Sequence, residues 1–160
     1  MTQEETKYKI LEEALKIVPV EGWSISTLEK ASVNAGYKEK MAELIFKDGV
    51  LSVIDFYFQD LDRKMVKAAL KLKTKSITQN VKISILQRIK ILSKNKALVS
   101  KTVTFLALPQ NTAVALKFIW RTADTIWHKV VCDTSTDFNY YSKRALLSGV
   151  YSSTIMYWLN

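Results

Sequence analysis

The sequence is short of the residues that interrupt regular structure or cross-link a chain. Its 160 residues include 2 prolines, 4 glycines and a single cysteine, Cys132. One cysteine excludes a disulfide within the chain and is typical of a reducing compartment. So few prolines and glycines favour long helices over a turn-rich β-sheet protein. A chain of this length can bury a core without disulfides, so we expect a single domain over residues 1–160.

Long apolar runs are also missing. The stretch 97–108 is interrupted by Lys101 and by threonines, and no run approaches the roughly 18 residues of a membrane-spanning helix. Residues 1–6 are polar and acidic, which predicts that no signal peptide precedes the fold. We therefore expect a soluble protein with at most peripheral membrane contact.

Acidic residues are absent from a long central segment. None occurs between Asp62 and Asp124, where fourteen lysines and arginines fall, and the whole chain carries a formal net charge of +9 with a pI near 9.6. Such a charge attracts phosphate-rich or anionic-lipid surfaces. Two interpretations stay open for this segment. It forms either the solvated faces of ordinary amphipathic helices or a surface that faces a membrane or a nucleic acid.

Catalytic constellations are lacking as well. The chain has one histidine and no Glu-x-x-His repeat for a di-iron centre, no glycine-rich phosphate loop, and no Cys-His signature around Cys132. We predict that the protein is not an enzyme, with no catalytic residues, no metal site and no cofactor. His128 lies four residues after Asp124, so these two side chains are predicted to pair on one helical face.

Apolar residues recur at intervals of three and four nearly throughout, which predicts an all-α protein. In this pattern Val33, Leu72 and Ile77 belong to the inward stripes of their helices. Helices are expected over residues 4–19, from Ser24 or Ser26 to about 35, and over 37–46, 50–73, 77–92, 96–108, 109–131 and 136 or 137 to the end.

The last of these helices carries apolar residues on two sides. One row contains Phe138, Tyr141, Ala145 and Gly149, and the other contains Leu147, Tyr151, Ile155 and Trp158. A helix that is apolar on both sides is either buried in a bundle or covered by a partner.

Three short helices followed by a long fourth resemble the N-terminal region of TetR-type regulators. The resemblance is carried by Ile10-Leu-Glu-Glu-Ala-Leu-Lys, Gly22-Trp23 and Ala35-Gly36. It implies a TetR-like helical bundle with a helix-turn-helix-like part over 1–49, whose third helix would enter the major groove. There Lys38 and Lys40 would meet phosphates, whereas Glu39 and Glu43 would face a polyanion. A dimeric, ligand-responsive transcriptional regulator is accordingly the alternative function.

The second half resembles a more specific family. Its motifs are Leu106-Ala-Leu-Pro-Gln-Asn111, Asp124-x-x-Trp127-His128, and Ser135-Thr-Asp-Phe-Asn-Tyr-Tyr-Ser-Lys-Arg-Ala-Leu146 with Tyr151. Together with Glu21-Gly-Trp23 and Lys47-Asp-Gly49 they are similar to the ubiquinone-biosynthesis accessory protein family, that of the ninth Coq protein. The resemblance implies a TetR-like fold that has lost DNA binding and uses residues 50–160 as a lipid-binding helical bundle.

The family resemblance also implies a function. The protein would bind isoprenoid quinone intermediates and present them, without catalysis, to the di-iron demethoxyubiquinone hydroxylase. Matching the family by position implies hydroxylase contact by Asp137, Asn139, Tyr140, Tyr141, Lys143 and Arg144. An isoprenoid tail needs an apolar lining, and the residues predicted for it, which are otherwise ordinary core, are Leu106, Leu108, Phe118, Ile119, Trp127, Phe138 and Leu146.

Assembly and location are further expectations. Dimerisation is common on this fold, so a homodimer is expected, and nucleic acid is not expected as a partner. A start so close to the fold and a composition rich in lysine and isoleucine favour the bacterial cytoplasm, with peripheral contact at the inner membrane. For a eukaryotic member the resemblance implies the mitochondrial matrix.

Overall fold

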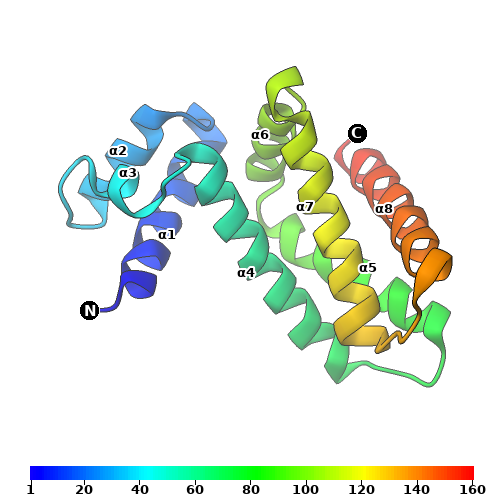
Figure 1. Cartoon of the computed structure of the whole chain (residues 1–160). Helices are drawn as coiled ribbons and strands as arrows, with labels where there is room; N and C mark the ends of the chain where they lie inside the picture. The colour runs from blue at the N-terminus through cyan, green and yellow to red at the C-terminus, as the bar shows by residue number, and fades with distance from the viewer. The chain divides into compact units, whose positions relative to one another are not determined.

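The computed structural model describes residues 1–160 and is all helical, which confirms the predicted class and is consistent with a TetR-like bundle (Figure 1). The elements in chain order are α1 (Gln3–Glu21), α2 (Ile25–Asn34), α3 (Met41–Ile45), α4 (Val50–Lys71), α5 (Ile77–Leu92), η1 (Ser93–Asn95), α6 (Lys96–Leu106), η2 (Pro109–Asn111), α7 (Thr112–Thr125), η3 (Ile126–Val131) and α8 (Asp137–Leu159). No helix is both long and apolar enough to cross a membrane.

The chain forms two compact units, each built from two stretches of sequence. The first unit contains Met1–Phe58 and Asn95–Leu108, and the second contains Gln59–Lys94 and Pro109–Asn160. Helix α4 begins in the first unit and ends in the second. The expectation that residues 1–160 form one domain, with its parts over 1–49 and 50–160, stays a prediction.

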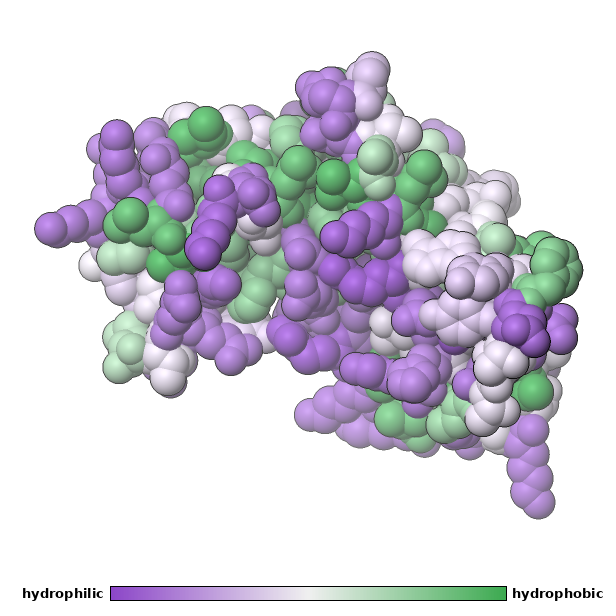
Figure 2. All heavy atoms as spheres, viewed as in Figure 1, coloured by the Kyte–Doolittle hydropathy of each residue, from purple (hydrophilic) through white to green (hydrophobic).

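Charge is divided unequally between the two units. The first has 9 lysines and arginines against 10 acidic residues, a net charge of −1, whereas the second has 15 against 5, a net charge of +10. Hydrophilic side chains accordingly cover much of the face drawn in Figure 2, but hydrophobic ones also reach it. The basic character of the protein is thus a property of the second unit.

The first unit is held together mainly by apolar packing. Helix α1 begins with a capping box, in which the backbone N–H of Thr2 donates to the Glu5 carboxylate at 2.8 Å and the Glu5 N–H donates to the Thr2 hydroxyl at 3.2 Å. The corner between α1 and α2 is tied to α6, because the indole N–H of Trp23 donates to the Thr102 hydroxyl at 2.9 Å. The fully buried apolar residues of α1 and α2 are Ile10, Leu11, Ala14, Val18, Leu28 and Ala31.

The second unit has an apolar core that also encloses charge. Its centre is formed by Met65, Ile85, Ala123, Ile126 and Leu147. Next to this core Arg88 is buried and donates one hydrogen bond to the Tyr151 hydroxyl and one to Asp62, both at 2.6 Å. Burial would lower the pKa of the Arg88 guanidinium, but the oxygens of Tyr151 and Asp62 outweigh it, so the pKa is raised and the charge is kept.

Several helix boundaries differ from those that periodicity predicts. Helix α1 continues past Pro19 to Glu21, since proline removes only its own N–H and the N–H of Gly22 still bonds to the Val18 carbonyl at 2.8 Å. Helix α3 covers 41–45 and not 37–46. Its first turn is fixed by the Ser32 hydroxyl, which accepts from the N–H of Ala42 at 3.1 Å.

Three residues predicted to face inward are exposed. Val33, Leu72 and Ile77 are 54%, 52% and 58% exposed. Val33 belongs to the last turn of α2, Leu72 follows the end of α4, and Ile77 is the first residue of α5. Helix ends have fewer neighbours to pack against than helix centres, so periodicity alone overestimates burial there.

Candidate functional site

The chain changes its helical geometry where α7 meets α8. Helix α7 passes directly into η3, a π-helical segment, which ends at Cys132 in the left-handed conformation with φ 61°. The N–H of Asp133 then bonds back to the Trp127 carbonyl at 2.9 Å. A π-helical turn inside an α-helix is rare and occurs frequently at functional sites. Here it directs the chain from α7 into the loop that precedes α8.

Arg144 is the centre of the contacts between α7 and α8. Its side chain is 1% exposed, and its Nε donates to Asp124 Oδ1 at 2.6 Å. Its Nη1 donates to the Tyr140 carbonyl at 3.2 Å and lies 3.5 Å from Asp133 Oδ2. The guanidinium carbon is 3.6 Å from the centroid of the Tyr140 ring, and the Tyr140 hydroxyl donates to Asp124 at 3.2 Å. Two carboxylates and an aromatic face therefore hold one buried cation.

Lys143 anchors the loop before α8. Its ammonium donates to Asp133 Oδ1 at 2.9 Å and to the Ser135 hydroxyl at 2.6 Å, and it lies 5.3 Å from the centroid of the Trp127 ring. The indole N–H of Trp127 in turn donates to the Lys143 carbonyl at 3.1 Å. The hydrogen bond from Lys143, supported by that from Ser135, outweighs burial and lowers the pKa of Asp133 to about 2.

The predicted pairing of His128 with Asp124 is wrong. Asp124 accepts its hydrogen bonds from Arg144 and Tyr140, and His128 is exposed. The physical reason is that α8 supplies both partners of the Asp124 carboxylate, Arg144 and Tyr140, whereas the side chain of His128 is exposed to solvent.

The residues predicted to contact a hydroxylase fall into two groups. Asp137, Asn139 and Tyr141 are exposed on the first turns of α8, where a partner has access to them. The other three, Tyr140, Lys143 and Arg144, are engaged within the chain, as described above. This second group positions the start of α8, and the first group is left to meet solvent or a partner. The role of both groups in partner binding stays a prediction.

Helix α8 has one buried and one exposed apolar side. The row Leu147, Tyr151 and Ile155 is buried and Trp158 is half-buried, whereas the row that begins with Phe138 and Tyr141 is exposed. No charged residue occurs from Ala145 to the end of the chain. Ser148, Ser152, Ser153 and Thr154 each donate to the carbonyl four residues earlier, so their hydroxyls are bonded within the helix. The exposed apolar side chains of α8 are Phe138, Tyr141, Leu146, Val150, Met156 and Tyr157.

The residues predicted to line a lipid cavity are dispersed. Leu106 and Leu108 belong to the first unit, and the other five belong to the second. Phe118 is a core residue at 5% exposure, and Ile119 and Trp127 are half-buried. Phe138 and Leu146 are 80% and 73% exposed, so they lie on the surface of α8 and do not line an interior cavity in this structure. The sequence of α8 gave no reason to prefer one of its two apolar faces. Packing against α7 buries the face with Leu147 and Tyr151 and leaves Phe138 and Leu146 outside.

Sequence reasoning missed the buried ion pairs. Arg88 follows Ser84 and Ile85 on the buried stripe of α5, and Arg144 continues the row of Leu147 and Tyr151 on α8. A charged residue in the register of a core stripe signals a buried, paired charge, because an unpaired one would be costly. That signal was available for both arginines, but their carboxylate partners lie on other helices.

Comparison with known proteins confirms the family resemblance. The COQ9 family model matches residues 112–160, which comprise α7, η3 and α8, the elements of the site. The chain is 27% identical to ubiquinone biosynthesis protein COQ9, mitochondrial, of Rattus norvegicus over 162 residues, 96% of this chain and 51% of the relative. The Homo sapiens protein of the same name is 26% identical, over 96% of this chain and 50% of the relative.

A more distant organism gives the same result. The probable ubiquinone biosynthesis protein coq9, mitochondrial, of Dictyostelium discoideum is 28% identical over 98% of this chain and 53% of its own length. The similarity therefore covers both units of this chain. The chain spans about half the length of the curated relatives it matches.

Proposed function

We propose that the protein acts in ubiquinone biosynthesis as a non-catalytic accessory protein that binds isoprenoid quinone intermediates and presents them to the di-iron demethoxyubiquinone hydroxylase. Relatives named for ubiquinone biosynthesis, similar over nearly the whole chain, support the pathway. Their names state a biosynthetic role and no reaction, in agreement with an accessory protein. Lipid binding and presentation are the finer part of the proposal and rest on the site.

The observation that carries the proposal is that α8 exposes apolar side chains on turns that are held rigidly in place. Arg144, Tyr140 and Lys143 fix the first turns of α8 against α7 and the preceding loop through hydrogen bonds to carboxylates at 2.6, 3.2 and 2.9 Å. Tyr141 and Phe138 project from these fixed turns and are 62% and 80% exposed. Rigid aromatic anchors on an ordered helix lose little conformational entropy on binding, which is a property of interaction hot spots. We propose the first turns of α8, with Phe138, Tyr141, Asp137 and Asn139 exposed, as the contact for the hydroxylase.

Partner binding is tested with a matched pair of tyrosines on α8. Tyr141→Ala is expected to weaken binding to the purified hydroxylase by about tenfold or more, which is typical of an interface hot spot. Tyr157→Ala removes the same side chain at the other end of the helix, where it is 87% exposed, and is expected to leave affinity unchanged. Surface plasmon resonance measures both. Equal affinities for wild type and Tyr141→Ala would refute the proposed contact.

Lipid binding is tested by identifying the lipid that copurifies with the protein. Phe138 and Leu146 give α8 an apolar surface, and the half-buried Ile119 and Trp127 extend apolar character to α7 and η3. Of the remaining predicted residues, Leu106 and Phe118 are buried and Leu108 is 40% exposed. Protein purified without detergent is expected to yield a near-stoichiometric isoprenoid quinone or polyprenyl lipid in the organic extract, measured by mass spectrometry. An extract with no such lipid would contradict this part of the proposal.

Membrane contact is proposed as peripheral and electrostatic. The second unit carries a net charge of +10, which attracts anionic lipid and is screened by salt. Association with vesicles containing phosphatidylserine is expected to fall steeply between low and high salt in a sedimentation assay. Association that does not depend on salt would rule out an electrostatic mechanism.

The relatives favour one of the two expected locations. Their names place them in mitochondria, which supports the mitochondrial matrix over the bacterial cytoplasm for this chain. We further propose a homodimer, which sedimentation equilibrium measures directly.

The alternative of a TetR-type regulator has no support. The five residues of α3 would extend only about 7.5 Å along a groove, and Glu39 and Glu43 beside or on it are exposed. These two carboxylates would repel a polyanion, and the exposed Lys38 and Lys40 beside them would attract it, so the segment has no uniformly basic surface for DNA. The relatives' names add nothing in favour of DNA binding.

A further inference from the structure

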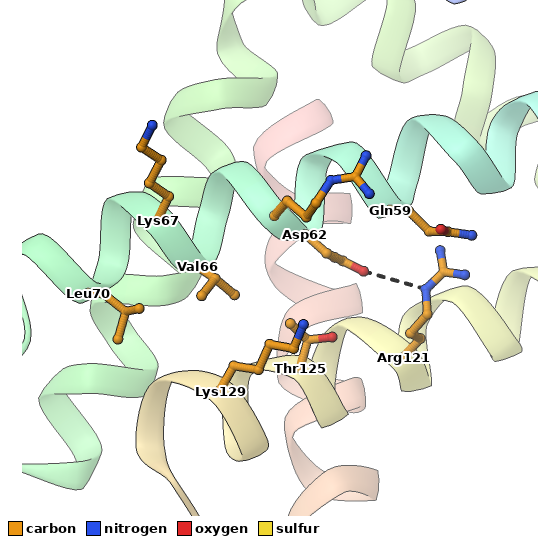
Figure 3. Close-up of a pocket in the computed structure, with 9 residues that line it drawn as sticks. Gln59, Asp62, Val66, Lys67, Leu70, Arg121, Thr125 and Lys129 are labelled. Carbon is orange, nitrogen blue, oxygen red and sulfur yellow. Dashed lines mark ion pairs between the residues drawn. The ribbon is translucent and has the colours of Figure 1, made fainter. Parts of the chain in front are cut away.

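A cleft of about 560 Å³ lies in the second unit between α4 and the end of α7 with η3 (Figure 3). Each side contributes residues spaced four apart, which form a row along one side of a helix. From α4 come Asp62, Val66 and Leu70, and from α7 and η3 come Arg121, Thr125 and Lys129. In Figure 3 the two rows point toward one another, and Lys129 extends toward Thr125. None of these six residues belongs to the predicted lipid-lining or hydroxylase-binding sets.

The cleft contains more positive than negative charge at its inner end. Asp62 is buried, and its Oδ1 accepts from Arg88 at 2.6 Å and from the Thr122 hydroxyl at 2.9 Å. Its Oδ2 faces Arg121 Nε at 3.5 Å and accepts no hydrogen bond. Two guanidinium groups therefore surround a single carboxylate. The charged residues that line the whole cleft are one acid, Asp62, and four bases: Arg63, Lys67, Arg121 and Lys129.

Positive charge also continues outward along the cleft. Lys129 is exposed at its edge and forms no ion pair, and Lys67 lies at its rim. Val66 and Leu70 provide an apolar wall between these cations. The side chain of Thr125 is half-buried and adds a hydroxyl donor. An arginine, a lysine and a hydroxyl can together bind a phosphate group. The apolar wall beside them can contact the carbon portion of a phosphate ester.

We infer that this cleft is a binding site for a phosphate-bearing ligand. Arg121 and Lys129 hold the phosphate oxygens, Thr125 donates a hydrogen bond to one of them, and Val66 with Leu70 contacts the organic part. Lys129 belongs to the π-helical segment and lines the cleft, which gives this irregular segment a role there. The phosphate is either that of a free ester or that of a lipid head group. This inference does not depend on quinone binding or on the hydroxylase.

The test uses the whole chain and two probes in NMR titrations of amide resonances. The probes are glycerol 3-phosphate and dihexanoyl phosphatidic acid below its micelle concentration. At least one is expected to bind saturably at millimolar concentration or below, with shifts centred on α4 and η3. Binding of both identifies a free ester as sufficient, and binding of the lipid alone identifies the head group of a lipid. Failure of both probes to bind, or shifts centred elsewhere, overturns the inference.

Variants separate the cleft from the general positive charge of the unit. Lys129→Gln is expected to weaken binding by about fivefold and Thr125→Val by about threefold, as the loss of a partly exposed charge and of one hydrogen bond. Lys117→Gln removes the same charge from the exposed side of α7, outside the cleft, and is expected to change affinity less than about twofold. Equal weakening by Lys117→Gln and Lys129→Gln would overturn the site. Arg121 is left intact, since it lies 3.5 Å from buried Asp62.

A lipid-free extract in the test of quinone binding would leave this result unaffected. Conversely, a quinone-bearing protein whose amides do not respond to either phosphate probe would refute the cleft and keep the proposed function. The two experiments therefore fail independently.

Discussion

The two units of the molecule differ in the polar residues that they bury. The first has a net charge of −1, and its buried polar residues, Thr27, Ser32 and Thr102, are all uncharged. The second has a net charge of +10, and all four buried charged residues of the chain belong to it: Asp60, Asp62, Arg88 and Arg144. The unit that carries the candidate site and the cleft is thus also the one that buries charge.

This difference indicates where function is located. Burying an ion pair seldom stabilises a fold more than apolar packing of the same volume would, because both ions must leave water. Apolar packing suffices for the first unit. In the second, Arg88 and Arg144 hold carboxylates at defined positions, one facing the cleft and the other at the junction of α7 and α8. Fixed charges of this kind are what binding sites need.

The largest expected effect comes from breaking the pair in the second unit. Arg88→Met leaves Asp62 without its main cation and is expected to lower the free energy of unfolding by about 3–5 kcal/mol. Lys90→Met, an exposed change with the same charge loss on the same helix, is expected to have an effect within about 0.5 kcal/mol. Urea unfolding followed by circular dichroism measures both. A loss below 1 kcal/mol for Arg88→Met would show that the second unit does not depend on its buried ion pair, which contradicts the contrast with the first unit.

Replacing one glycine in each unit by alanine tests the comparison through backbone conformation alone. Gly22 in the first unit has φ 78° and ψ −178°, which is a region almost restricted to glycine, whereas Gly149 lies within α8. A Cβ at either position would meet no atom within 4 Å. Gly22→Ala is expected to destabilise by about 1–3 kcal/mol and Gly149→Ala to stabilise by about 0.5–1 kcal/mol. Thermal unfolding gives the sign of each change, and the same sign for both would contradict the prediction.

Trp23→Phe tests whether the units unfold together. It removes the buried hydrogen bond to Thr102 and is expected to destabilise the first unit by about 1–2 kcal/mol. Trp120, Trp127 and Trp158, the remaining tryptophans, all lie in the second unit, so fluorescence then reports that unit and circular dichroism reports both. Coincident midpoints in urea would indicate one cooperative transition. Unchanged stability by both signals would contradict the role of this hydrogen bond.

The smallest expected effect is a dependence on pH in the second unit. The folded-state pKa of Asp133 is about 2, below the ordinary value of about 3.9 for an unfolded chain. Its contribution to stability is therefore present above about pH 4 and is lost as the pH falls through about 2. Asp133→Asn is expected to be less stable than wild type at pH 7, with the difference vanishing near pH 2.

Asp48→Asn, at an exposed position in the first unit, is the control for this titration. At pH 7 its free energy of unfolding is expected to lie within about 0.5 kcal/mol of the wild type, because the side chain is exposed. A constant difference between wild type and Asp133→Asn from pH 7 to pH 2 would show that the Asp133 contacts do not depend on its charge.

Much of the fold was predictable because it follows from local spacing. The bounds of α5 were predicted at both ends, and the start of α8 at Thr136 or Asp137 agrees with the observed helix from Asp137. Predictions were less accurate where a distant side chain intervenes, as at α3, whose start is fixed by Ser32. For the site, Asp124 was singled out, but it was assigned to His128 four residues away and not to Arg144 twenty residues away.

The sequence by itself determined the helical class, the total charge and the family resemblance, because each depends on composition, periodicity or short motifs. Only the tertiary structure decided how that charge is divided, since both units combine stretches that are distant in sequence. It also decided which apolar side of α8 is buried and which carboxylate each buried arginine contacts. Arg88 and Tyr151 are 63 residues apart and Arg88 and Asp62 are 26 apart, and only packing brings such residues within hydrogen-bonding distance.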